Sequence, residues 1–212
     1  MIRKLLVIAA AVAMPVSVVA VTSGVAGAKV KPPTAATDTA TCSGLSGTIS
    51  FSEPLTNAGY PSGIETTTVS GTLSGCTASG GFAVSGLSAT LSGTYAGKAG
   101  SAKHPSGVCT GLLGATKEKG SIAVGWTSSP PVPNTTISLK SAAGGVGTNG
   151  NASFSLTGSY KGSFGGADKG KSSSVEAYTT ASVGTLAAEC AGAGISSLTI
   201  VSPPTGNPIT LG

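Results

Sequence analysis

The stretch Leu87-Ser88-Ala89-Thr90-Leu91-Ser92-Gly93-Thr94-Tyr95 carries the clearest structural pattern in this chain. Its odd positions are apolar or small and its even positions are hydroxyl residues, which is the period of two expected for a strand with one buried face. The runs 122–126, 137–139 and 154–160 repeat this alternation. We expect their Ser and Thr side chains to face water or a hydroxyl-compatible ligand. Short, evenly spaced strands with almost no long helix predict a mainly β fold, either an antiparallel β-barrel or a β-sandwich.

The two halves of the chain are similar in sequence. Residues 47–51 match residues 120–124, and residues 91–98 match residues 156–162. This similarity indicates an internal duplication of a three-strand unit. Chance similarity within a chain rich in Gly, Ser and Thr is the alternative.

Two stretches without strand alternation follow these units, at residues 105–114 and 180–191. In the second, apolar or small residues recur at i, i+3, i+4 and i+7, a pattern that ends at Cys190 and is typical of a short helix. A strand follows each stretch, at Ser121–Trp126 and Ser197–Ser202. The predicted order is three strands, a short helix or turn, three strands, a short helix and a final strand.

Residues 1–28 have the three parts of a secretory signal peptide. A basic start precedes an apolar stretch at 5–21, and a small-x-small cleavage pattern ends at Ala28. An uncleaved membrane anchor is the alternative. The apolar stretch contains Pro15 and is shorter than the roughly 18–20 residues that a spanning helix needs. We therefore expect a secreted or cell-envelope protein with no stable membrane insertion once the signal is removed.

Cleavage would leave a chain that begins at Lys29. Residues 29–41 are expected to form a flexible linker, and residues 42–212 a single disulfide-stapled β domain. Loss of Arg3 and Lys4 lowers the formal net charge from +5 to +3. The remaining basic residues are scattered lysines without an arginine fork, which argues against nucleic-acid binding.

Four cysteines in an exported chain predict two disulfides, for which three pairings exist. Cys42 opens one alternating run and Cys76 closes a second one, and turn-forming residues 57–63 lie at their midpoint. An antiparallel hairpin folded at that turn would place Cys42 beside Cys76. Cys109 would then pair with Cys190. Each closure is worth about 4 kcal/mol in the chain-entropy model.

Two glycine-rich segments match nucleotide-binding patterns. Residues 165–172 fit G-x-x-x-x-G-K-S, and residues 145–150 fit G-x-G-x-x-G. The first lacks the buried parallel strand and following helix that would hold a phosphate. The second is better interpreted as a hairpin turn at Asn149-Gly150. We therefore predict no nucleotide and no cofactor-binding residue.

Catalytic and metal-binding candidates are sparse. The single imidazole, His104, lies near Ser106 in a Pro/Gly turn, but no G-x-S-x-G elbow occurs. No C-x-x-C spacing suggests a metal site. The seven acidic residues form no local pair for glycoside chemistry: Asp38, Glu53, Glu65, Glu118, Asp168, Glu176 and Glu189. The sequence thus predicts no catalytic, cofactor-binding or metal-binding residue.

Trp126 is the one tryptophan of the chain and ends an alternating strand. Packing in the core or under a lid is the favoured interpretation. The alternative is an aromatic platform for a sugar or an apolar ligand at a barrel mouth.

Three cysteine-containing segments are distinctive: residues 41–45 (Thr-Cys-Ser-Gly-Leu), residues 72–76 (Thr-Leu-Ser-Gly-Cys), and Cys109 followed by Leu112-Leu113-Gly114. In these segments the chain resembles small secreted Gly/Ser/Thr-rich proteins with four cysteines from high-GC Gram-positive bacteria. The resemblance covers residues 41–202 and implies an exported, disulfide-stapled β domain. It implies no catalytic residue.

Three functional hypotheses remain from the sequence. The first is an exported, non-enzymatic β protein that binds a small ligand or a surface partner. The second is a hydrolase acting on cell-wall or glycan material. The third is an envelope pore, although aromatic residues make up only 4% of the chain, too few for the two aromatic girdles of a membrane barrel.

Overall fold

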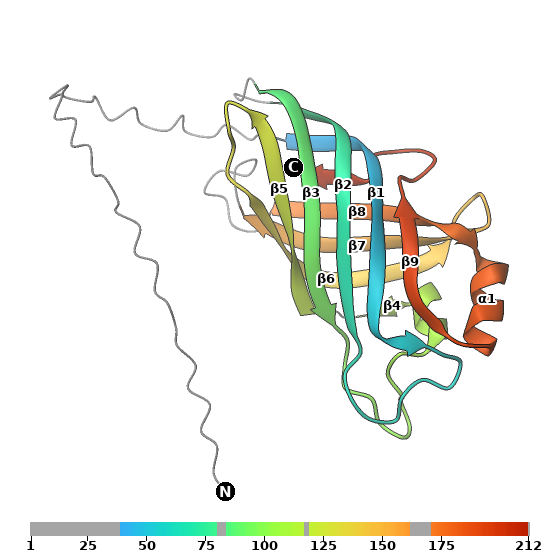
Figure 1. The fold of residues 1–212 in the computed structure, drawn as a ribbon. Helices are drawn as coiled ribbons and strands as arrows, with labels where there is room; N and C mark the ends of the chain where they lie inside the picture. The colour runs from blue at the N-terminus through green and yellow to red at the C-terminus, as the bar shows by residue number, and fades with distance from the viewer. Residues whose placement is uncertain (1–38, 80–83, 117–118, 162–170, 212) are drawn as a thin grey trace, which may run out of the picture. The chain divides into compact units, whose positions relative to one another are not determined.

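In the computed structural model, residues 39–79, 84–116, 119–161 and 171–211 are described, and they form an antiparallel β-barrel (Figure 1). The strands are β1 (Thr39–Leu55), β2 (Thr66–Ser79), β3 (Ser85–Ala96), β4 (Ala115–Thr116), β5 (Lys119–Ser129), β6 (Thr135–Val146), β7 (Asn151–Lys161), β8 (Lys171–Ser182), β9 (Ile195–Val201) and β10 (Ile209–Leu211). Two helices accompany them, the 3-10 helix η1 (Cys109–Leu113) and the α-helix α1 (Val183–Ala191).

The sheet closes into a ring, which resolves the choice between barrel and sandwich. The strands follow the order β1-β2-β3-β5-β6-β7-β8, and β9 and β10 share the closing position. The start of β1 pairs with β10, whereas the segment from Ser46 to Leu55 pairs with β9. β8 also pairs with both strands. All strand pairings are antiparallel, so the main barrel strands run up and down in chain order.

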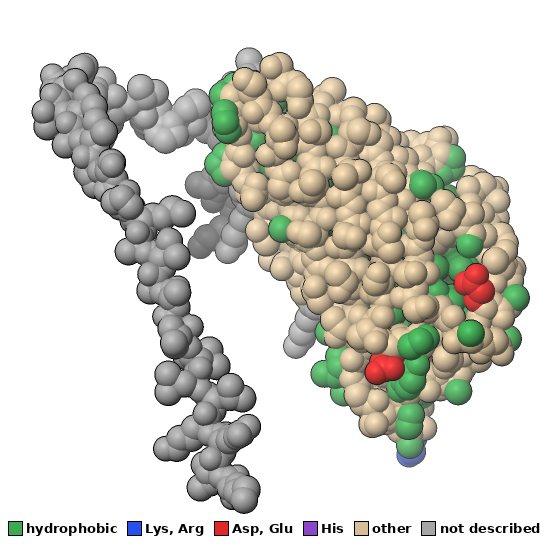
Figure 2. All heavy atoms as spheres, in the orientation of Figure 1, with side chains coloured by type: hydrophobic (Ala, Val, Ile, Leu, Met, Phe, Trp, Pro, Cys, Tyr) green, Lys and Arg blue, Asp and Glu red, His purple; other side chains and the backbone are tan. Residues whose placement is uncertain are grey.

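The alternation seen in the sequence separates an apolar interior from a hydroxyl-rich exterior. In β3, Leu87, Ala89 and Leu91 are buried, while Thr90 and Ser92 are exposed. The strand register aligns one exposed hydroxyl from each of six strands in a row around the barrel: Ser197, Ser50, Thr68, Thr94, Ser121 and Ser138. Figure 2 shows that the face over β1, β2 and β3 is largely free of charged and apolar side chains.

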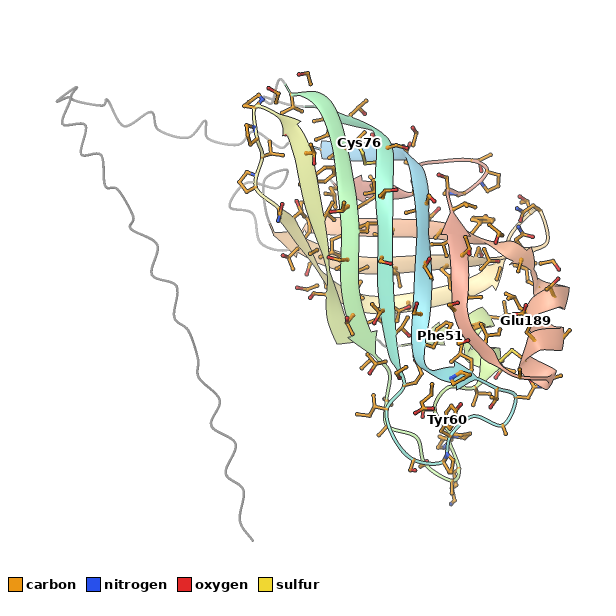
Figure 3. All side chains as sticks on the ribbon, in the orientation of Figure 1. Phe51, Tyr60, Cys76 and Glu189 are labelled. Carbon is orange, nitrogen blue, oxygen red and sulfur yellow. A yellow bond between two sulfur atoms is a disulfide. The ribbon has the colours of Figure 1, made fainter. Side chains whose placement is uncertain are left out.

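One end of the barrel is filled by β10 and the first disulfide. Ile209 and Leu211 of β10 are fully buried. Cys42 and Cys76 lie directly opposite each other on β1 and β2 and form the predicted disulfide. Cys42 is also fully buried, so the disulfide is part of the interior at this end. Tyr60 lies in a loop at the opposite end (Figure 3).

The boundary between linker and domain lies earlier than we expected from the sequence. β1 begins at Thr39, so residues 39–41 of the expected flexible linker belong to the barrel. They are held by pairing with β2 on one side and with β10 on the other. The expected signal peptide and most of the phosphate-loop match at 165–172 lie outside the described residues.

The predicted duplication misses one long strand. β8 lies between β7 and α1 and pairs along most of β7, whereas a duplicated three-strand unit has no strand there. Its inward side chains include Ser173, Val175, Ala177 and Thr179. Because small and hydroxyl residues make up most of this inner face, the apolar signal of the alternation is weak. Both helical predictions hold, as η1 within 105–114 and α1 within 180–191.

None of the described helices combines the length and apolar composition that crossing a membrane requires.

Candidate functional site

A cavity of about 710 Å³ lies at the end of the barrel opposite the first disulfide. On one wall, Phe51, Thr67 and Tyr95 are direct cross-strand neighbours on β1, β2 and β3. On β7, Phe154 and Leu156 form a second wall. Figure 3 shows Phe51 within this end of the barrel, above the loop that carries Tyr60. Three aromatic side chains from three strands therefore surround one space.

The polar group deepest in the wall is satisfied by a neighbouring carboxylate. Thr67 is only 3% exposed, and its Oγ1 donates to the carboxylate oxygens of Glu65 at 3.1 and 3.2 Å. Glu65 itself is half-buried and also lines the cavity. A buried hydroxyl without a partner would be costly, so this pairing fixes both side chains against the wall.

A long loop after β3 lines one end of the cavity and is hydrogen-bonded to the β1–β2 loop. The backbone N–H of Tyr60 donates to the carbonyl of Ser106 at 2.7 Å, and the N–H of Ser106 donates back to Tyr60 at 2.9 Å. Thr56 donates to the carbonyl of Gly107 at 3.1 Å, and Cys109 donates to the carbonyl of Thr56 at 3.0 Å. These bonds join the β1–β2 loop to residues 97–114, which we call the lid. The lid is therefore an ordered part of the fold.

The lid is anchored to the barrel at η1. A Cβ atom on Gly144 of β6 would lie 1.6 Å from the Leu112 carbonyl oxygen, so η1 packs directly on the β6 backbone and requires glycine there. The N–H of Gly144 also donates to the carbonyl of Gly114 at 2.9 Å. The second predicted disulfide, Cys109–Cys190, ties the lid to α1.

Helix α1 has its own local start and a buried face. Ser182 precedes it, and its Oγ accepts a hydrogen bond from the N–H of Thr185 at 3.1 Å, which is an N-cap. Leu186 and Cys190 are its buried residues. The helix thus holds Cys190 in a fixed place for the lid.

The cavity reaches solvent beside the first part of the lid. Lys98, Ser101 and His104 line the cavity and are exposed. Leu55 and Leu156 also line the cavity and are buried. The cavity therefore combines apolar walls with a polar entrance that carries Lys98.

His104 and Ser106 both lie at the cavity, yet they are not arranged as a base and its nucleophile. The N–H groups of Ser101 and His104 each donate to the other's carbonyl, at 2.9 and 3.1 Å. The Ser106 Oγ donates to the carbonyl of Gly63 at 3.3 Å. Within the described part of the chain, no group of three or more His, Cys, Asp and Glu residues could hold a metal ion.

The two remaining candidates from the sequence have structural roles. Trp126 is buried, and its Nε1 donates to Thr135 Oγ1 at 3.0 Å, which confirms the core interpretation. The G-x-G-x-x-G match is a hairpin turn between β6 and β7, in which Gly150 donates to the carbonyl of Gly147 and has a φ of 77°. A positive φ of this kind favours glycine.

The sequence reasoning did not single out the lining residues Phe51, Glu65, Thr67, Tyr95 and Phe154 as a site. A usable signal was the position of Phe51 and Tyr95, since both lie near a strand end on the inward phase of the alternation. Their proximity depends on strand register, which the sequence leaves open.

Comparison of the chain with protein-family models, with curated proteins and with solved structures found no match.

Proposed function

We propose that this chain is an exported, non-enzymatic binding protein that holds one small, largely apolar molecule inside its barrel. The observation that carries the proposal is the lidded cavity of about 710 Å³ with Phe51, Tyr95 and Phe154 in its walls. Ligand sites commonly measure about 300–1,000 Å³ and combine apolar walls with a few polar groups.

The barrel size supports this proposal. Its main strands occupy eight positions, with β9 and β10 sharing one of them. Barrels of about this strand number can hold one small ligand inside. Here side chains fill the end near Ile209 and leave the end near Phe51 open.

Export is part of the proposal and rests on two features. Residues 1–28 have the pattern of a signal peptide. The described domain contains two disulfides, which persist mainly in oxidising compartments outside the cytosol. The resemblance to small secreted proteins of high-GC Gram-positive bacteria agrees with this location.

The two alternatives receive less support. A lipid-facing barrel needs an apolar outer band, whereas exposed positions such as Ser50, Thr68, Thr94 and Ser121 carry hydroxyls. A hydrolase based on His104 would need an oriented nucleophile, and Ser106 Oγ donates to a backbone carbonyl instead.

A neutral fluorescent dye tests the proposal directly. The exported protein, with both disulfides formed, is titrated with N-phenyl-1-naphthylamine, and we expect saturable enhancement at one dye per chain. Ala142→Trp would place a large side chain in the cavity, which Ala142 lines, and should abolish the enhancement. Ser138→Trp is the matched control, because Ser138 is exposed on the same strand.

Circular dichroism would establish that both variants remain folded. Dye binding to the wild-type protein and to Ser138→Trp, but not to Ala142→Trp, supports the proposal. Absence of binding to the wild-type protein, or equal binding by the two variants, would overturn it.

A further inference from the structure

The cavity has an uneven distribution of charge along its length. Its walls contain apolar residues such as Phe51 and Leu156, whereas its entrance carries Lys98 and His104. Lys103 lies in the same lid segment and is exposed as well. Residues 97–114 contain no Asp or Glu. The entrance is therefore cationic along the lid.

The carboxylate in the cavity wall does not neutralise this entrance. Glu65 accepts the hydrogen bond of Thr67 Oγ1 from the wall of the barrel. Glu65 lies at the lid end of the barrel, because the N–H of Gly97 donates to its backbone carbonyl at 3.4 Å. Lys98 and Lys103 outnumber this one carboxylate, so the lid end keeps an excess of positive charge. A negatively charged group is therefore favoured beside the lysines and disfavoured beside Glu65.

We infer that the ligand is a single-chain anionic amphiphile, a long-chain carboxylate or a monoalkyl phosphate, with its head at Lys98 and His104. This inference rests on the proposed function and names the ligand class for the same cavity. The alkyl chain would lie between Phe51, Tyr95 and Phe154, where burial of each methylene is favourable. The charged head would stay at the solvent-exposed entrance, where its desolvation is small.

The test compares ligands that share one chain and differ only in the head. Dodecanoate, dodecyl phosphate and dodecylammonium below their micelle concentrations, and dodecanol below its solubility limit, are used to displace N-phenyl-1-naphthylamine from the exported protein. We expect both anions to bind up to about fivefold more tightly than the alcohol at low salt, as for a charge pair at an exposed site. The difference should shrink at 0.5 M salt, because salt screens exposed charges.

Matched lysine variants locate the head. Lys98→Gln should weaken dodecanoate binding about fivefold and leave dodecanol binding unchanged. Lys103→Gln is the control, because Lys103 is exposed on the lid without lining the cavity, and it should change dodecanoate binding much less. The tighter of the two anions identifies the head as carboxylate or phosphate.

Three results would overturn the inference: dodecanol binding as tightly as the anions, dodecylammonium binding more tightly, or equal effects of Lys98→Gln and Lys103→Gln. Each of these leaves the dye bound and the proposed function standing. Failure of the dye itself to bind is the separate result that removes the proposed function.

Discussion

Gly144→Ala should displace the lid from the barrel. The new Cβ would lie 1.6 Å from the Leu112 carbonyl oxygen and 2.5 Å from its carbon, and real Cβ contacts below 3.0 Å essentially do not occur. η1 must therefore move by about 1.4 Å or more, against a backbone that cannot rotate away as a side chain could. Overpacking of this kind costs about 1–3 kcal/mol. For a domain of this size, the expected fall in Tm is roughly 3–10 °C.

Thermal unfolding followed by circular dichroism measures the cost, and amide hydrogen exchange shows where it arises. The N–H groups of Ser106 and Cys109 bind carbonyls of the β1–β2 loop, so their exchange should accelerate when the lid moves. Gly145→Ala is the matched control, because its Cβ would meet only the Ser153 Oγ at 3.2 Å. If Gly144→Ala matches this control in both Tm and exchange, the lid is not seated on β6 as described.

Two further tests address the interior and the lid anchor. Thr135→Val removes the acceptor that the Trp126 Nε1 uses at 3.0 Å inside the core, and should lower the free energy of unfolding in urea by about 1–3 kcal/mol. The control Thr135→Ser keeps the hydroxyl and should cost about 1 kcal/mol. A Val variant as stable as the wild-type protein would contradict the role of this bond. Replacing Cys109 and Cys190 together by Ala removes a disulfide that spans 81 residues. In the chain-entropy model, this should lower the free energy of unfolding by about 4.5 kcal/mol. An unchanged urea midpoint would show that the lid is held by its hydrogen bonds alone.

The strands that could be predicted are those whose inner faces are strongly apolar. β3 places Leu87 and Leu91 inside, so its alternation is unmistakable in the sequence. β8 has the same alternation of burial, but three of its four inward residues named above are small or carry a hydroxyl, and their hydropathy differs little from that of the outward ones. Which side chains of β8 point inward is determined by its pairing with β7 and β9. This pairing depends on the tertiary structure and not on the local sequence of β8.

The disulfide pairing could be predicted from the sequence because it depends on a local hairpin. Cys42 and Cys76 are brought together by the β1–β2 hairpin alone, and the second pair follows by elimination. The closure of the ring could not be predicted from the sequence in the same way. It requires β1 to change partners from β10 to β9 along its length, and no pattern within β1 indicates this change.

The cavity follows from a difference between the two ends of the barrel that only the assembled fold reveals. At one end, Cys42, Ile209 and Leu211 meet in the interior and exclude solvent. At the other, Phe51 and Tyr95 are half-buried, and the lid spans the opening instead of filling it. Aromatic surface left in contact with water lacks the stabilisation that its burial would give. A ligand covering that surface would supply this stabilisation.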